Sequence, residues 1–161
     1  MLDRLSARGL SARFDHVAHA AHRIRDLLPI YQELLGGVFV HGGANPRVGY
    51  RAVQLAFSDG TRVELLEPLA GSTFLDRFFE RNPRGGLHHV TFKIDDIKAA
   101  IATAEAMELV VVGAYFDNPR WQEAFLHPRG AYGALLQLVE TDPNYPPRNA
   151  ELALESVLDE A

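Results

Sequence analysis

Two histidines and two glutamate or glutamine residues recur at one spacing along the chain. His16 and His89 lie 73 residues apart, and Glu64 and Gln137 lie the same distance apart. Each histidine precedes a valine in FDHVAHA or LHHVTFK, and each partner lies inside an apolar stretch, VELLEP or LLQLVE. Imidazole nitrogens and carboxylate or amide oxygens are ligands of divalent metal ions. The repeat therefore predicts one metal site that takes its four ligands from two related halves.

A histidine in a strand is, on its own, more often a packed core residue than a ligand. The equal spacing of all four residues favours the metal site over that alternative. Such a donor set suits Zn, Ni, Co, Mn or Fe(II), with positions left for water or substrate. We expect no ligand role for the remaining histidines, which are His19, His22, His41, His88 and His127.

The elements that must position these residues follow the same order twice. Alternating apolar residues predict strands, and apolar residues at helical spacing, such as Leu27, Ile30 and Leu34, predict helices. Asp95 or Asp96 can cap the second helix. The first half is expected to run strand 14–20, helix 23–37 and strands 38–41, 50–57 and 61–68. The second is expected to run strand 87–94, helix 95–108 and strands 109–116, 121–128 and 134–140.

This order predicts an α+β fold of two tandem βαβββ modules that form a curved mixed sheet around one cleft. The modules span about 14–68 and 87–141 of a domain covering 14–141. Residues 1–13 form a leader, and residues 142–161 form a tail with a helix. That helix starts near Asn149 and bears an apolar stripe for docking or dimer formation.

Composition narrows the class of protein. The chain has 161 residues and no cysteine, which excludes a disulfide framework and a thiolate zinc site. Its net charge is −5, and residues 149–161 contribute four acidic and no basic side chains, so no nucleic-acid surface is expected. Without a signal peptide or a long apolar segment, we expect a soluble, cytoplasmic protein with no membrane contact.

Several motifs resemble one protein family across residues 14–141. DHVA, VELLEPL, GGLHHV, DDI, FLHP and LLQLVE are similar to the vicinal oxygen chelate superfamily, most closely its methylmalonyl-CoA epimerase branch, with glyoxalase I as a relative. The resemblance implies paired modules around a divalent metal ion and removal of a proton next to a substrate carbonyl. It also implies a small-molecule carbonyl substrate, with acyl-CoA as one candidate, and a homodimer. The implied metal ligands are His16, Glu64, His89 and Gln137.

The sequence departs from the epimerase pattern at the acid–base positions. That pattern has a glutamate where Gln137 stands, and an amide cannot exchange a proton usefully. It also has an acid before the third strand, where this chain reads HGGANPRVGY. Glu64 can then serve as both ligand and base, and Glu123 as a second acid, unless Glu123 is an exposed strand residue. Arg47, Arg51 and Arg84 are candidates for phosphate contacts or for solvated surface groups.

Three functions remain open from the sequence. The first is a metal-dependent isomerase or lyase that moves a proton next to a carbonyl. The second is an Fe(II)-dependent dioxygenase, because two histidines and a carboxylate also form a facial triad. The third is a protein of the same fold that binds a small molecule without catalysis.

Overall fold

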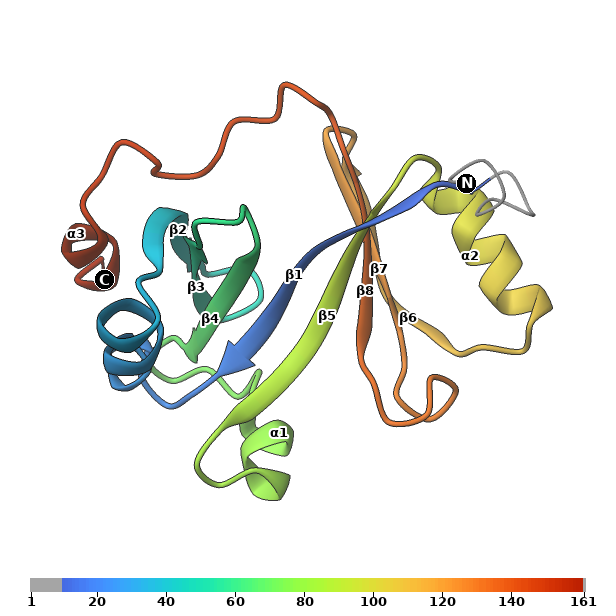
Figure 1. The fold of residues 1–161 in the computed structure, drawn as a ribbon. Helices are drawn as coiled ribbons and strands as arrows, with labels where there is room; N and C mark the ends of the chain where they lie inside the picture. The colour runs from blue at the N-terminus through green and yellow to red at the C-terminus, as the bar shows by residue number, and fades with distance from the viewer. Residues whose placement is uncertain (1–9, 161) are drawn as a thin grey trace. The chain divides into compact units, whose positions relative to one another are not determined.

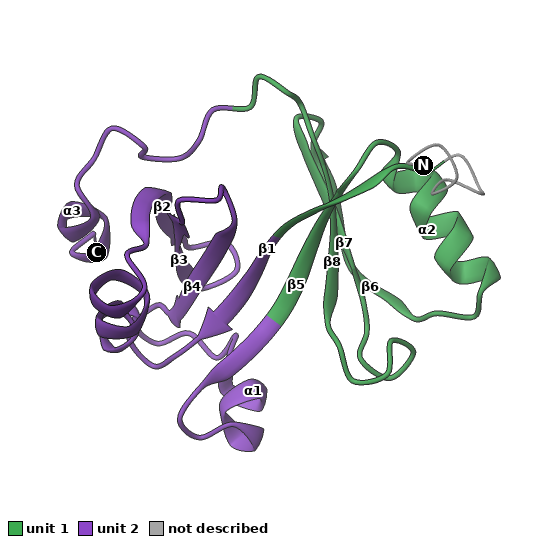
Figure 2. Cartoon of the chain, viewed as in Figure 1, with its two compact units in different colours: residues 1–15, 89–145 green, residues 16–88, 146–161 purple. Residues whose placement is uncertain are grey.

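The computed structural model describes residues 10–160, and the chain divides into two compact units. Unit 1 contains the chain up to Asp15 and residues 89–145, and unit 2 contains residues 16–88 and the chain from Pro146 onward (Figure 2). Both units are therefore built from two separate segments of the sequence.

Strands β1 (Ala12–Ala20) and β5 (Gly86–Ile94) each begin in one unit and end in the other. The boundary falls directly before His16 in β1 and directly before His89 in β5. The two candidate ligands thus occupy the same position relative to the boundary, at the first residue of the unit that the strand enters.

Unit 2 contains β2 (Val38–Asn45), β3 (Tyr50–Ala56) and β4 (Arg62–Pro68), and the strand order with β1 is β2-β3-β4-β1. The β2–β3 and β3–β4 pairs are antiparallel, whereas β1 and β4 are parallel. The Asp59-Gly60 turn joins β3 to β4 as predicted, with Gly60 at φ 83°. The helices of this unit are η2 (Ile24–Asp26), η3 (Pro29–Leu34), α1 (Asp76–Arg81) and α3 (Leu154–Leu158).

Unit 1 contains β6 (Val111–Asn118), β7 (Trp121–Leu126) and β8 (Leu136–Thr141). The strand order with β5 is β5-β8-β7-β6, with β5 and β8 parallel and the other pairs antiparallel. The unit's helix lies beside the strands (Figure 1), and Ile97 and Ala100 pack with Ile94 and Ala124. The side chain of Asp96 caps this helix by accepting the N–H of Ala99 at 2.8 Å, as predicted. This helix is α2 (Ile97–Ala106).

The repeat extends to the pairing register inside each unit. Ala18 of β1 pairs with Glu64 of β4, and Thr91 of β5 pairs with Gln137 of β8, both members being 73 residues further along. The α+β class and the two tandem βαβββ modules are therefore confirmed. The single cleft, the module limits and the domain limits stay predictions.

A second pair of contacts repeats at the same spacing and was missed from the sequence. Glu67 accepts the N–H of Ile24 at 2.7 Å, and Glu140 accepts the N–H of Ile97 at 2.9 Å. Each acid is the second-to-last residue of the last strand of its half, and it accepts the N–H at the start of that half's first helix. The signal was present in the terminal acids of VELLE and LQLVE.

The prediction of one α-helix over 23–37 is wrong. This segment forms a 3-10 helix, η2, and a π-helix, η3, and only Leu27 of the expected apolar face is buried. Ile30 and Leu34 are 46% and 77% exposed. Pro29 has no N–H and its ring conflicts with the carbonyl one turn earlier, so a continuous α-helix cannot pass through it. The wider π-turn then places the following side chains on other faces.

The C-terminal tail packs on unit 2. Its helix α3 buries Val157 and Leu158 in a core shared with Ile24, and Gly42 of β2 donates its N–H to the Arg148 carbonyl at 2.9 Å. The helix starts after Ala153, so Asn149 is not its cap; Asn149 lies in a turn with φ 52°. The predicted apolar stripe therefore covers the unit's own core.

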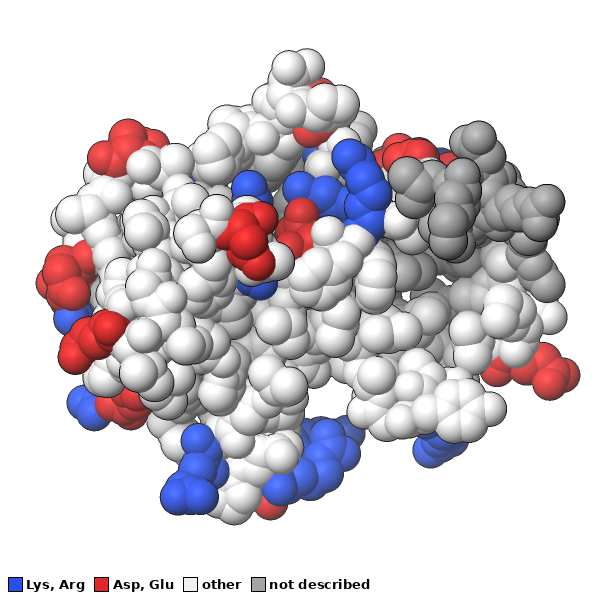
Figure 3. All heavy atoms as spheres, in the orientation of Figure 1, with Lys and Arg blue, Asp and Glu red and all other residues white. Residues whose placement is uncertain are grey.

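The surface and the helix lengths complete the description. On the face shown in Figure 3, acidic and basic side chains are interspersed and separated by wide uncharged areas. Within residues 10–160, no helix has the length and apolar character needed to span a membrane. The predicted leader lies mostly outside the described residues, and Leu10 packs against the core of unit 1.

Candidate metal centre

Unit 2 brings His16 and Glu64 together. His16 of β1 is 3% exposed, and its Nε2 lies 3.7 Å from Oε2 of Glu64 on the neighbouring strand β4. The alternation of β1 directs His16 and Ala18 to one face, and Ala18 pairs with Glu64, which explains the approach. The structure therefore brings the two candidate ligands of the first half next to each other.

Gln54 of β3 joins this pair, although the sequence had not indicated it. It lies directly across from Glu64, is 5% exposed, and places its Nε2 3.3 Å from both His16 Nδ1 and Glu64 Oε2. The available signal was a glutamine inside the apolar stretch YRAVQLAF, since a buried polar side chain requires hydrogen-bond partners.

Unit 1 provides the second pair of predicted ligands, His89 and Gln137, both 8% exposed. The Phe125 ring meets the His89 ring edge-on, with centroids 6.1 Å apart and planes at 87°. The hydroxyl of Thr91, a residue that is 1% exposed, donates to Gln137 Oε1 at 2.7 Å. Thr91 was also missed from the sequence, because its role depends on its register with Gln137.

Glu123 lies beside Gln137 rather than out on the surface. Its Oε2 accepts the Nε2–H of Gln137 at 2.8 Å and the indole N–H of Trp121 at 3.2 Å. The side chain is partly buried. These two donors hold the carboxylate next to the position where the epimerase pattern has its glutamate.

The donor chemistry of the two pairs fits a divalent ion. Each pair offers one imidazole and one oxygen donor, namely the Glu64 carboxylate or the Gln137 amide. The amide is correctly oriented, because its N–H faces the Glu123 carboxylate and its oxygen faces the Thr91 hydroxyl. An amide oxygen has two lone pairs, so one stays available for a metal ion after the bond from Thr91.

The remaining histidines make other contacts. His88 packs against the Phe78 ring with centroids 5.0 Å apart, and burial lowers its pKa from 6.5 to about 4. His19 bonds the Tyr31 hydroxyl at 2.9 Å, and burial lowers the pKa of His19 as well. His22 stacks on Phe79 and approaches the Pro83 carbonyl. None of these three contacts brings a further metal-ligand side chain to the candidate centre.

One suggested phosphate contact is wrong. Arg51 is buried and forms an ion pair with Glu67, and it also donates to the Glu160 carbonyl. A buried guanidinium held by a carboxylate and a carbonyl is a structural link between β3, β4 and the tail. It is not placed to meet a ligand from solvent.

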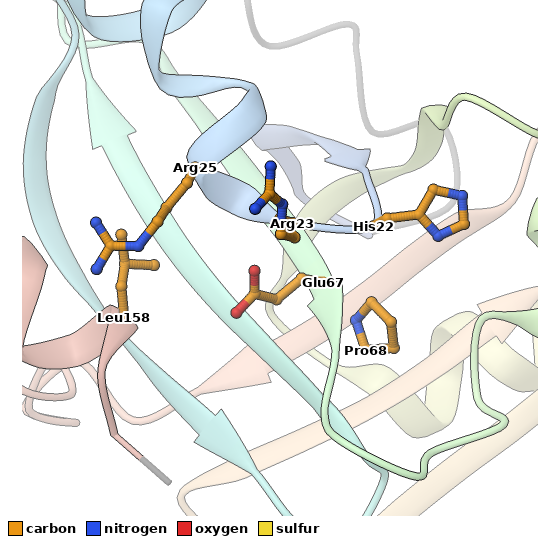
Figure 4. A pocket seen from close by; sticks show the side chains of 6 residues that line it. All are labelled: His22, Arg23, Arg25, Glu67, Pro68 and Leu158. Carbon is orange, nitrogen blue, oxygen red and sulfur yellow. The ribbon is translucent and has the colours of Figure 1, made fainter.

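A surface pocket of about 260 Å³ lies elsewhere in unit 2 (Figure 4). Its charged side chains already have partners in the same unit: Arg23 pairs with Asp26, and Arg25 pairs with Glu155 and Asp159. Glu67 faces it while accepting the bond from Ile24. The pocket marks the contact of the tail with η2 and contains none of the predicted ligands.

Known proteins resemble this chain over most of its length. Methylmalonyl-CoA epimerase from Dictyostelium discoideum is 27% identical over 130 residues, which cover 80% of this chain and 78% of the relative. Ethylmalonyl-CoA/methylmalonyl-CoA epimerase from Cereibacter sphaeroides is 29% identical over 131 residues, covering 78% and 96%. The structure of a Streptomyces coelicolor methylmalonyl-CoA epimerase variant in complex with 2-nitronate-propionyl-CoA matches with a TM-score of 0.68 and 26% identity, covering 80% and 96%.

These relatives are enzymes, and they confirm the resemblance drawn from GGLHHV, FLHP and the related motifs. The family model described as Glyoxalase/Bleomycin resistance protein/Dioxygenase superfamily matches residues 15–125. That range includes His16, Glu64, His89 and Glu123. The chain belongs to the glyoxalase/bleomycin resistance protein/dioxygenase superfamily.

Proposed function

We propose that this protein is a metal-dependent epimerase that moves a proton next to the carbonyl of an acyl-CoA, as its epimerase relatives suggest. The observation that carries the proposal is the matched pair of donor sets: His16 with Glu64, and His89 with Gln137, at one spacing and in one strand register. A buried imidazole next to an oxygen donor is costly to retain twice without a role.

The proposed metal site takes all four of these residues as ligands of one divalent ion. Two imidazoles and two oxygens match Zn, Ni, Co, Mn or Fe(II), and which of these is bound stays a prediction. A bound ion of this kind supplies Lewis acidity that stabilises negative charge on a carbonyl oxygen. The chain's own contribution is to hold its ligands in buried positions.

Proton transfer is assigned to Glu64 and Glu123. One carboxylate takes the proton from the carbon next to the carbonyl, and the electrons of the C–H bond move onto the carbonyl oxygen. The other side chain, protonated as the carboxylic acid, gives its proton to the opposite face of that carbon and becomes the carboxylate, which inverts the carbon. Glu123 supplies the acid that Gln137 cannot, because its Oε2 lies only 2.8 Å from Gln137 Nε2.

The substrate class rests on the relatives. A nitronate is planar and anionic, like the enolate that proton removal creates, and the S. coelicolor epimerase is in complex with such a compound joined to propionyl-CoA. Exposed arginines lie on and just after α1, and they suit the phosphates of CoA; they are Arg77, Arg81 and Arg84. Basic side chains gather on the lower part of the face shown in Figure 3. Cytoplasmic location, homodimer formation and the lyase alternative stay predictions.

The decisive experiment measures exchange of the C2 proton of methylmalonyl-CoA with deuterium oxide. We expect exchange with the metal-loaded protein, and loss of exchange after chelation with recovery on adding Zn, Co, Ni or Mn. Metal-loaded protein that shows no exchange would exclude epimerisation of this substrate. Oxygen consumption with Fe(II) would instead favour the dioxygenase, and binding that survives chelation without turnover would favour a binding protein.

The metal site has its own test. His16→Ala and His89→Ala should each weaken metal affinity by more than about 100-fold, since even outer contacts of a metal ligand are worth 10–100-fold. The loss should be visible as a lower metal content of the purified variants, measured by elemental analysis. His127→Ala, at an exposed histidine, is the matched control and should leave the metal content unchanged. Full metal content in both ligand variants would remove the proposed site.

A further inference from the structure

Gln54 touches both candidate ligands of unit 2 and is otherwise unassigned. Its Nε2 lies 3.3 Å from His16 Nδ1 and 3.3 Å from Glu64 Oε2, and the side chain is 5% exposed. We propose that Gln54 is a positioning residue that orients His16 so that Nε2 is the nitrogen that binds the metal ion. This inference rests on the metal site of the proposed function.

The ring orientation follows from the two contacts of His16. Gln54 occupies the Nδ1 side of the imidazole, whereas Nε2 is the nitrogen that faces Glu64, 3.7 Å from Oε2. Nδ1 is therefore engaged by a protein side chain, and Nε2 points toward the other oxygen donor of the same half. A metal-binding histidine usually has its second nitrogen held in this way, which fixes the tautomer and the ring.

The amide also explains how one side chain serves two tautomers of His16. An amide N–H directed toward Nδ1, as in this contact, suits the tautomer whose ring proton is on Nε2. Coordination through Nε2 requires the proton on Nδ1 instead.

Gln54 has the group that the second tautomer needs. Its Oε1 is buried, and no group among residues 10–160 donates a hydrogen bond to it. Rotation of the amide by half a turn exchanges Nε2 and Oε1, so that Oε1 accepts the Nδ1–H of His16. A glutamine can do this, whereas a leucine or methionine of similar size cannot.

Unit 1 shows why this role is specific to one half. The residue across from Gln137 is Phe125, in the register position that Gln54 occupies across from Glu64. Phe125 holds His89 by ring packing, with no polar atom to select a nitrogen. At this register position, a polar side chain that can select a ring nitrogen is therefore present for His16, as Gln54, and is replaced by Phe125 for His89.

The test begins with the wild-type protein and ¹⁵N-labelled histidine. Two-bond ¹H–¹⁵N correlation spectra, with the His16 signals assigned by their loss in His16→Asn, should show the proton on Nε2 without metal and on Nδ1 with Zn. A proton already on Nδ1 without metal would overturn the two-tautomer account. This measurement involves no substitution of Gln54 and so does not depend on a variant that folds.

The second measurement is the Zn dissociation constant of three variants. Gln54→Met should weaken binding by about 10- to 100-fold, whereas Gln54→Glu, which restores an acceptor for Nδ1–H, should bind within a few-fold of wild type or more tightly. Gln122→Met, on β7 outside the site, should have no effect. Equal affinity in Gln54→Met and wild type would refute the role of Gln54, while absence of Zn binding in wild type would refute the metal site itself.

Discussion

Each half of the molecule places one carboxylate beside one amide, but the strand that carries the carboxylate in one half carries the amide in the other. In unit 2 the carboxylate, Glu64, is on the last strand and the amide, Gln54, is on the strand before it. In unit 1 the amide, Gln137, is on the last strand and the carboxylate, Glu123, is on the strand before it. In both halves the amide N–H lies within hydrogen-bond distance of the acid, at 3.3 Å and 2.8 Å.

This exchange shows that each half of the candidate site is defined by an acid and an amide together, and not by the residue type at one position. Gln54 lies straight across from Glu64, whereas Glu123 is across from Val139, two residues beyond Gln137. The acid of unit 1 therefore approaches the amide diagonally, a distance that long side chains bridge. A search for a glutamate at position 137 finds none, although the acid is present on the neighbouring strand.

The largest expected effect comes from removing each acid. Glu64→Gln and Glu123→Gln should each slow epimerisation by about 10²- to 10⁴-fold, the usual contribution of a general acid or base. Each should still exchange the C2 proton of one methylmalonyl-CoA epimer, because the remaining carboxylate serves one face. Deuterium incorporation into each pure epimer, followed by mass spectrometry, separates the two roles.

The control for these variants is Glu105→Gln on α2, which should retain full activity. Metal content must be measured in each case, because Glu64 is also a proposed ligand. An epimerisation rate of Glu123→Gln equal to that of the wild type would show that Glu123 does not take part in the reaction.

The next largest effect distinguishes the two acids that bind the helix starts. Glu67→Gln should lower the free energy of unfolding by about 3–5 kcal/mol, because it leaves the buried cation of Arg51 without its carboxylate. Glu140→Gln should cost only about 1 kcal/mol, since a glutamine oxygen can still accept the N–H of Ile97. Urea unfolding monitored by circular dichroism measures both, and equal losses would contradict the assigned role of Arg51.

The residues that precede the two candidate histidines should differ in how they make the free energy of unfolding depend on pH. His88 is buried against Phe74 and Phe78, with its pKa at about 4, whereas its counterpart Asp15 pairs with Lys93 at 3.1 Å. The folded state disfavours protonated His88, so its contribution to stability is complete above pH 6.5 and decreases as the pH falls toward 4. The loss is about 3 kcal/mol at 1.36 kcal/mol per pH unit.

The measurement is urea unfolding between pH 4 and pH 7 in the presence of a chelator. His88→Phe should remove most of this pH dependence, and His127→Phe, at an exposed position, should leave it intact. An unchanged pH profile in His88→Phe would mean that His88 does not titrate as its burial implies.

The smallest effect concerns the hydroxyl that orients Gln137. Thr91→Val keeps the size of the side chain but removes the donor to Gln137 Oε1, which should cost about 1 kcal/mol of unfolding free energy. Thr91→Ser retains the hydroxyl and should restore the bond. Unit 2 has Ala18 at the matching position and therefore no such donor, so the loss measures a feature of unit 1 alone.

The sequence was sufficient to identify residues whose chemistry is rare at strand positions. His16, His89 and Glu64 could be recognised because charged and ligating side chains at a repeated spacing seldom arise by chance, and the strands around them alternate clearly. Gln54 and Thr91 could not, because neutral polar residues are common in strands and only the pairing register shows what they touch. The first helix was misread because Pro29 changes the local hydrogen bonding while leaving the apolar spacing unaltered.

The placement of the unit boundaries within β1 and β5 limits how the chain can be divided. Because each unit is assembled from two segments, no single cut in the polypeptide releases either one whole. A chain with only one βαβββ module would contain most of one unit, together with a strand start that belongs to the other unit. Two copies would have to exchange those strand starts to complete a unit, so the duplicated chain has the connectivity of a strand-swapped dimer fused into one polypeptide. Co-expressed fragments that divide the chain between α1 and β5 should therefore assemble with each other, and neither should fold alone.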